Sequence, residues 1–127
     1  MEKNPLYGAG AAVSGAPYTP AVRVGDMVFI SGQLGLDPET KQPHAEFAAQ
    51  VEGAIAGIKA LVEAAGGSLD NIVKTTIFLS GDMSRFAELN AIYAAHFSEG
   101  IRPARSTFAV AALPLGALVE IEAIAVL

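Results

Sequence analysis

The chain has 127 residues, of which 52% are hydrophobic, and it contains neither Trp nor Cys. This composition fits one ordinary domain over residues 1–127, and it excludes disulfides, thiolate metal sites and a thiol nucleophile. The net charge of −5 is scattered without a basic stripe, so a nucleic-acid partner is disfavoured because phosphate binding needs clustered Lys and Arg.

Further features of the sequence indicate the cellular compartment of the protein and its oligomeric state. No apolar run reaches the roughly 18 to 20 residues of a membrane span, and the start, Met1-Glu2-Lys3-Asn4-Pro5, has no signal-peptide pattern. With the absence of Cys, this predicts a cytoplasmic protein and no membrane partner. The high apolar fraction and few charges predict an oligomer, in which further apolar surface is covered.

The first half of the chain is predicted to begin with an irregular arm and a hairpin. Residues 5–21 are rich in Gly, Ala and Pro, which indicates the arm. Two short strands follow at 22–24 and 27–31, and the Gly25-Asp26 pair between them is a hairpin turn signal. Residues 36–43 form a polar loop.

Helical and strand patterns then alternate. Apolar residues recur at helical spacing over 47–65, between Pro43 and Gly66. A β-branched and aromatic run at 72–79 predicts a strand, and the apolar spacing over 86–97 predicts a second helix. We therefore expect strand-helix-strand units, which favour parallel pairing with the helices on one face of a sheet.

Two last strands are predicted at 105–111 and 118–126. The odd positions of the final strand are all apolar and should lie under the helices, whereas its even positions mix Glu120 and Glu122 with apolar residues. The overall prediction is an α+β fold, with a mixed β-sheet and two helices on one face. A mixed outer face suits a sheet that packs against another subunit around a polar pocket.

Arg105 and Glu120 are the strongest candidates for chemistry. A guanidinium held by a rigid segment matches a carboxylate with two parallel donors, so Arg105 is either a carboxylate clamp or an ordinary salt-bridge partner. Glu120 is either a solvated or Arg-paired strand residue, or a general acid/base whose pKa burial would raise. If both face one cavity, the chain has an acid-recognising site with a proton carrier.

Other polar residues carry weaker signals. Tyr18 is an anchor for the arm or a lid over a pocket. Ser31 and Ser106 lie outside any nucleophile elbow, so structural hydrogen bonds explain them better. Asn90 is an indifferent helix former, which favours a specific side-chain hydrogen bond. His44 and His96 are the only histidines, and they lack metal-ligand spacing, so no metal site is predicted.

Together, several segments resemble the Rid superfamily, also called the YjgF or reactive intermediate deaminase family, and its RidA-like members in particular. The Pro-Ala-Arg-Ser and Glu-Ile-Glu-Ala segments are its strongest signature. The matching segments span nearly the whole chain in the family's order: Ala16-Pro17-Tyr18, Ile30-Ser31-Gly32-Gln33, 72–78, Asn90-Ala91-Ile92-Tyr93, Pro103-Ala104-Arg105-Ser106 and 119–125.

The resemblance implies a chorismate-mutase-like fold assembled as a homotrimer, with a central barrel of sheets and sites in the clefts between subunits. It also implies hydrolysis of reactive 2-imino or enamine acids, such as 2-aminoacrylate, to 2-keto acids and ammonia, without a cofactor. Three alternatives stay open: a ribonuclease or translation inhibitor, a non-catalytic trimer that binds small acids, and a deaminase of a different enamine acid.

By the same resemblance, Arg105 binds the substrate carboxylate and Glu120 orients or activates water. Backbone groups near Gly32 and Thr107 contact the substrate, Tyr18 closes the pocket, and Ser31 and Asn90 shape it. Two positions depart from the family pattern. Ala16 replaces the usual Gly before Pro-Tyr, and Thr107 stands where many members have Cys.

Overall fold

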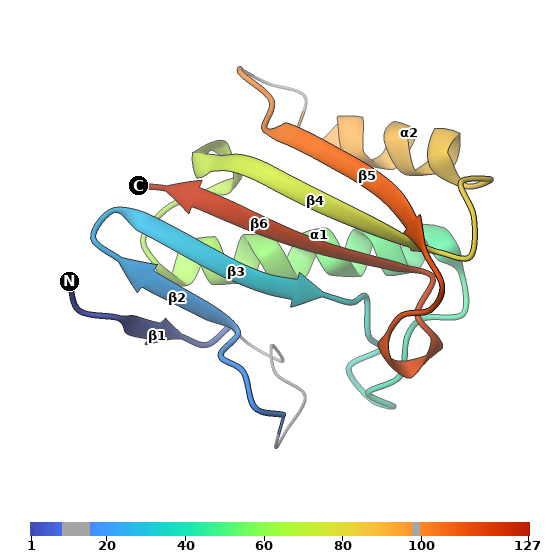
Figure 1. Ribbon diagram of the computed structural model, residues 1–127, viewed down its shortest axis with the longest axis horizontal. Helices are drawn as coiled ribbons and strands as arrows, with labels where there is room; N and C mark the ends of the chain where they lie inside the picture. Colours follow the sequence, from blue (N-terminus) through green and yellow to red (C-terminus); the bar gives the residue numbers. More distant parts are fainter. Residues whose placement is uncertain (9–15, 98–99) are drawn as a thin grey trace.

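The computed structural model describes residues 1–8, 16–97 and 100–127. Its two helices lie against the same face of one six-stranded sheet, which confirms the predicted α+β fold (Figure 1). The elements in chain order are β1 (Asn4–Leu6), β2 (Ala21–Val24), β3 (Met27–Gln33), α1 (Phe47–Ala64), the 3-10 helix η1 (Leu69–Asn71), β4 (Ile72–Ser80), α2 (Phe86–His96), β5 (Ala104–Val110), the 3-10 helix η2 (Pro114–Gly116) and β6 (Val119–Val126).

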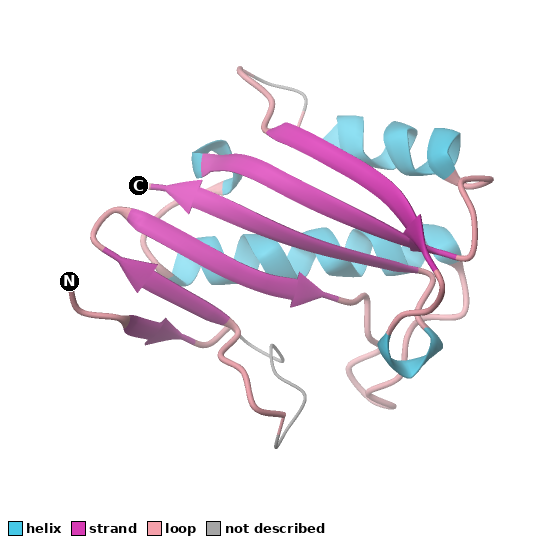
Figure 2. Cartoon of the chain, viewed as in Figure 1, coloured by secondary structure: helices cyan, strands magenta, loops and turns pink. Residues whose placement is uncertain are grey.

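The sheet is mixed, with the strand order β1-β2-β3-β6-β4-β5. β4 and β5 are connected through α2 and pair in parallel, as the strand-helix-strand pattern predicted. β6 lies between β3 and β4 and is antiparallel to both. β3 and β4, which α1 connects, therefore run in the same direction without being neighbours (Figure 2).

The prediction of an irregular arm over residues 5–21 is wrong at both of its ends. Asn4–Leu6 forms strand β1, which pairs antiparallel with β2, and Ala21 already belongs to β2. Pro5 is compatible with this strand because β1 is the edge of the sheet, where a missing N–H need not interrupt a ladder. The middle of the predicted arm, residues 9–15, lies outside the described residues.

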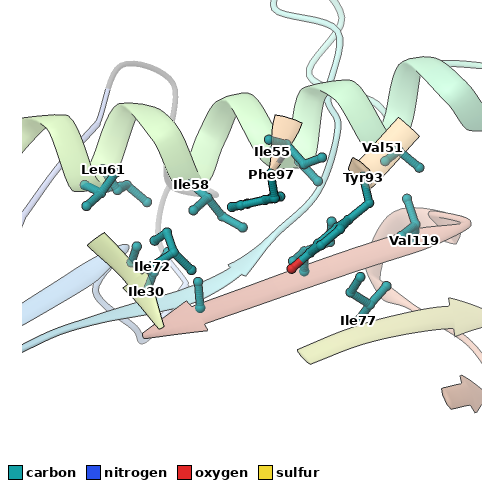
Figure 3. Packing of buried hydrophobic residues seen from close by; sticks show 14 of the residues in the cluster. Ile30, Val51, Ile55, Ile58, Leu61, Ile72, Ile77, Tyr93, Phe97 and Val119 are labelled. Atoms are coloured by element: carbon teal, nitrogen blue, oxygen red, sulfur yellow. The ribbon is translucent and has the colours of Figure 1, made fainter. Parts of the chain in front are cut away.

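The core fills the space between α1, α2 and the sheet. The apolar stripe of α1 points toward the sheet and includes Val51, Ile55, Ile58 and Leu61, all at most 1% exposed (Figure 3). The odd positions of β6 meet this stripe as predicted, because they are buried from Val119 to Ala125.

In the described part of the chain, neither helix has the length and apolar character needed to cross a membrane.

One polar contact lies inside this core and connects α2 to the sheet. The Oγ1 atom of Thr75 on β4 and the hydroxyl of Tyr93 on α2 are 2.8 Å apart, and Thr75 is fully buried. Burial raises the pKa of Tyr93, so its hydroxyl stays neutral. Tyr93 also stacks on Phe97, with ring centroids 4.5 Å apart. These contacts fix the face of α2 that lies beside β5.

We expect Thr75→Val to lower the free energy of unfolding by about 1 to 3 kcal/mol, because it leaves the Tyr93 hydroxyl buried without a partner. Tyr93→Phe should cost a similar amount. The double variant Thr75→Val/Tyr93→Phe should cost less than the sum, since both polar groups are then gone. Urea unfolding of the four proteins measures this coupling, and strictly additive losses would contradict it.

Candidate functional site

A large cavity opens beside the C-terminal end of β3. The pairing with β2 stops there, because the first residue of β2, Ala21, lies opposite Ile30. The volume of the cavity is about 850 Å³. Its walls come from the segment before β2, the end of β3 with the loop that follows it, α1, η2 and the outer face of the sheet at β4 and β6. Among the predicted site residues, the cavity brings together Tyr18, Ser31, Gly32 and Glu120.

Glu120 lies against Gly32, and the fit depends on the missing side chain of the glycine. A Cβ atom at Gly32 would lie 2.7 Å from Cδ and 2.9 Å from Oε2 of Glu120, closer than real contacts allow. The register between β3 and β6 shifts between Ile30 and Gln33, so Gly32 lies in a bulge. The bulge and the glycine together let the carboxylate lie flat against the backbone.

Hydrogen bonds hold this bulge in place. The Ser31 hydroxyl donates to the carbonyl of Thr19 at 2.7 Å, and the Gln33 side-chain amide donates to the carbonyl of Ser31 at 2.9 Å. Ser31 thus has the structural hydrogen bond that we expected, while its position on the cavity wall keeps it available to shape a pocket. Gln33 is 8% exposed and was not predicted as a site residue. Its signals in the sequence were its position just after a predicted strand and its place in the matching segment Ile30-Ser31-Gly32-Gln33.

Glu120 is half-buried, and its environment favours the protonated form. Burial raises the pKa of Glu120, and the negative charge of Glu122 adds to the increase. Glu122 lies two residues along the same strand, so it points to the same face and lines the same cavity. The Glu120 carboxylate is therefore a stronger base than an ordinary exposed carboxylate, as a proton carrier requires.

Arg105 lies beside α2 and is held in a fixed orientation. Its Nη2 atom donates to Oδ1 of Asn90 at 2.7 Å. The guanidinium carbon lies 4.9 Å from the ring centroid of Tyr93 and 5.6 Å from that of Phe86. Asn90 thus has the specific side-chain bond that its helical position suggested. The remaining guanidinium donors of Arg105 are oriented by this stacking, as a carboxylate clamp requires.

Thr107 lies two residues beyond Arg105 on the same face of β5. Its Oγ1 atom is buried and has no hydrogen-bond partner among the described residues. An unpartnered buried hydroxyl is costly, so this atom marks a place where a further partner would be favourable. Ser106 points to the opposite face, where the ammonium group of Lys74 donates to its hydroxyl at 3.1 Å.

A single chain does not bring Arg105 and Glu120 into one cavity, contrary to the simplest form of our hypothesis. In the register of the sheet, Arg105 on β5 pairs with Thr75 of β4, whereas Glu120 on β6 pairs with Phe78 of β4. Partners in register share a face, and positions an odd number apart on one strand face opposite sides. Arg105 therefore lies on the helix side of the sheet and Glu120 on the outer side. The described residues contain no ion pair of Arg105 with Glu120 or Glu122.

The described residues do not assemble a metal site. No group of three or more His, Asp or Glu side chains lies close enough within residues 1–8, 16–97 and 100–127 to hold a metal ion. His96 at the end of α2 instead contacts Glu52 of α1, with 2.5 Å between Nε2 and Oε2. His44 lies in the loop after β3, where its Cδ2 atom would be 3.7 Å from a Cβ at Gly53 of α1.

Replacing Glu122 by Gln should lower the pKa of Glu120 toward its ordinary value, although burial keeps part of the increase. A raised pKa in the folded state means that stability falls as pH rises from the unfolded value through the folded value. Glu122→Gln should make this fall smaller. Carboxyl ¹³C NMR titration measures the pKa, and urea unfolding below and above that pH window measures stability. An unchanged Glu120 titration would contradict this prediction.

Comparison with known proteins agrees with this fold. The family model described as Endoribonuclease L-PSP matches residues 9–127. The chain is 46% identical to the 2-iminobutanoate/2-iminopropanoate deaminase of Escherichia coli K12 over 112 residues, which is 87% of each chain. It is 43% identical to protein HMF1 of Saccharomyces cerevisiae over 122 residues, covering 96% of this chain and 93% of that protein.

Solved structures show the same likeness. RidA from an Antarctic Psychrobacter superposes with a TM-score of 0.90 at 46% identity, covering 98% of this chain and 99% of the other. Escherichia coli TdcF with bound serine superposes with a TM-score of 0.90 at 37% identity, covering 98% of each chain. The match over nearly the whole chain, in both sequence and fold, means that this protein belongs to the Rid family, also called the YjgF or Endoribonuclease L-PSP family.

Proposed function

We propose that this protein hydrolyses reactive 2-imino and enamine acids, such as 2-aminoacrylate, to 2-keto acids and ammonia. The observation that carries the proposal is a preorganised guanidinium, Arg105, combined with a half-buried carboxylate of raised pKa, Glu120. Relatives at 46% identity are named 2-iminobutanoate/2-iminopropanoate deaminases, which supports the same chemistry here. In cells, we place the protein in the cytoplasm.

Water attack on an imine needs little from the protein beyond positioning and one proton carrier. Arg105 binds the substrate carboxylate through two parallel donors and so fixes the imine carbon. Glu120 accepts a proton from a water molecule as its oxygen bonds to that carbon. The resulting carbinolamine takes this proton from Glu120 on its nitrogen. The carbon–nitrogen bond then breaks with ammonia as the leaving group, and the hydroxyl proton passes to Glu120 as the keto group forms. An enamine enters this sequence after protonation at its terminal carbon.

Because one chain separates the two groups, we propose that the site is completed by a second copy, in a homotrimer with a central barrel of sheets. One copy would supply Tyr18, Ser31, Gly32 and Glu120, and its neighbour Asn90, Arg105 and Thr107. The outer face of the sheet supports this assembly, because it exposes apolar side chains that a partner would cover. These side chains are 41% to 46% exposed: Met27, Phe29, Phe108 and Val126.

The protein should accelerate pyruvate release when a PLP-dependent dehydratase generates 2-aminoacrylate from serine. Arg105→Ala should lose about 2 to 5 kcal/mol of transition-state binding, because the carboxylate loses its bidentate partner. Arg23→Ala is a matched control, since Arg23 bonds the carbonyls of Gly25 and Ala65 at the other end of the molecule. Equal rates in Arg105→Ala and wild type would contradict the proposal.

Mixing two inactive variants tests whether two chains share the site. Arg105→Ala and Glu120→Gln chains should each be inactive alone. When they are refolded together, about one quarter of the clefts in randomly mixed cyclic trimers receive both intact residues. Activity should therefore recover to about a quarter of the wild-type value by that count. Recovery no greater than the sum of the two variants would place the complete site within one chain.

RNA cleavage is a second candidate, favoured by the description of the matching family as an endoribonuclease. The net charge of −5 weighs against it, because RNA binding depends on clustered cations. Salt-sensitive RNA cleavage that survives rigorous purification and disappears in Arg105→Ala would support it.

Binding of small acids without turnover is a third candidate, which the solved structure of TdcF with bound serine keeps open. Keto-acid binding without any imine hydrolysis would favour that role.

A further inference from the structure

Two walls of the cavity, the loop after β3 and strand β6, come from distant parts of the chain. One buried side chain bonds to the loop and to the residue just before β6. Gln50 on α1 is 3% exposed. Its Nε2 atom donates to the carbonyl of His44 at 2.7 Å, and its Oε1 atom accepts from the backbone N–H of Leu118 at 2.8 Å. A single amide thus connects the loop after β3 to the start of β6.

The first of these bonds anchors the loop wall. The backbone N–H of His44 donates to the carbonyl of Gly35 at 3.0 Å, and Leu36 forms a bridge with Pro43. The loop therefore closes on itself, and the bond from Gln50 fixes its closed end to α1. Leu36 lines the cavity from this loop.

The second bond anchors the wall that carries Glu120. The carbonyl of Leu118 accepts from the backbone N–H of Ser80 at 3.0 Å, so the Leu118 peptide groups are held from both sides. Glu120 follows two residues later, where its carboxylate lies against Gly32. A shift of the start of β6 would therefore move Glu120 relative to the opposite wall.

The packing around Gln50 leaves little freedom for this connection. A Cβ atom at Gly35 would lie 2.2 Å from the backbone carbonyl oxygen of Gln50, and one at Gly53 would lie 2.7 Å from the Cα atom of Gly35. The loop thus lies directly on the helix backbone. The side chain at position 50 must both donate and accept, because a part-buried backbone carbonyl and a part-buried N–H depend on it.

We infer that Gln50 is a positioning residue: it sets the distance between the loop wall and Glu120 without lining the cavity itself. Where turnover is concerned, this inference rests on the proposed imine hydrolysis. Misplacing a catalytic group by about 1 Å can cost 10²-fold in rate. Because Arg105 belongs to the other face of the sheet, substrate affinity should depend on Gln50 less than the chemical step does.

The test replaces Gln50 with Met, which has a similar volume and no hydrogen-bonding amide. At a temperature where circular dichroism shows a fully folded protein, Gln50→Met should lower kcat at least about tenfold and change KM less than about threefold. Gln50→Glu retains the acceptor for Leu118 and should recover part of kcat. If both variants keep kcat within about twofold of wild type, the inference is wrong.

Asn71 offers a matched control at the opposite end of β6. Its side-chain amide donates to the carbonyl of Val126 at 3.0 Å and accepts from the backbone N–H of Ser68 at 2.8 Å. It therefore also connects a loop to β6, but away from the cavity. Asn71→Ala should leave kcat unchanged. A loss of kcat equal to that in Gln50→Met would show a general effect of stability and overturn the positioning role.

A second readout does not depend on turnover. Glu120 shares the cavity with Glu122, Asp37 and Lys41, and all of these charges remain in Gln50→Met. If the walls separate, water reaches Glu120 and its raised pKa should fall toward the ordinary value, as carboxyl ¹³C NMR can measure. An unchanged titration in the folded variant would overturn the inference. If wild type hydrolyses no imine but this shift occurs, the deaminase proposal fails and the positioning role stands.

Discussion

β6 lies between β3 and β4 in the sheet, and the alternation of its side chains determines what each face can do. Its odd positions are buried under α1, so its even positions must point outward. Glu120 thereby lies on the face opposite to α1 and α2, whereas Arg105 on β5 lies on the helix side. The two charged groups are separated by the thickness of the sheet, so a site that used both would need a second chain, as proposed above.

The precision of the cavity depends on close contacts between backbones. Gly32 admits the Glu120 carboxylate, and Gly35 lies directly on α1 near Gln50. Gly57 leaves room for the side chain of Gln33, whose Oε1 atom would be 2.7 Å from a Cβ at that position. Glycines inside a helix normally weaken it, so those in α1 are better explained by this close approach. The helix loses intrinsic stability and gains a fixed distance to the cavity wall.

Most of the fold could be predicted from the sequence, because hydrophobic periodicity reports local structure directly. The positions of both helices and of the strands from β2 to β6 follow from it, as does the buried face of β6. Strand β1 was missed, since Pro5 and its neighbours have no strand pattern and only pairing with β2 makes them extended. Tertiary contacts, which a local pattern does not contain, decide such segments.

The candidate site was predicted less completely, for a related reason. Arg105 and Glu120 stood out as charged residues in apolar strands, and the alternation of β6 predicted the face of Glu120. The face of Arg105 depends on the register of β5 with β4, which the sequence does not specify. Gln33 and Gln50 were missed because a buried amide looks like an ordinary polar residue until its partners are known. The sequence indicated Glu122 only as part of a mixed face, as a possible partner of Arg105 and as a member of the Glu-Ile-Glu-Ala segment. Its influence on Glu120 depends on their shared cavity.

The separation of the two charges also explains how Glu120 can keep a raised pKa although the proposed site contains an arginine. A guanidinium beside Glu120 in the same chain would stabilise its negative charge and lower the pKa. Here burial and Glu122 act without that opposing charge. In the proposed trimer, a partner's guanidinium would reach the cleft together with the substrate carboxylate that it binds. That carboxylate offsets the positive charge, so Glu120 retains the proton affinity that its role toward water requires.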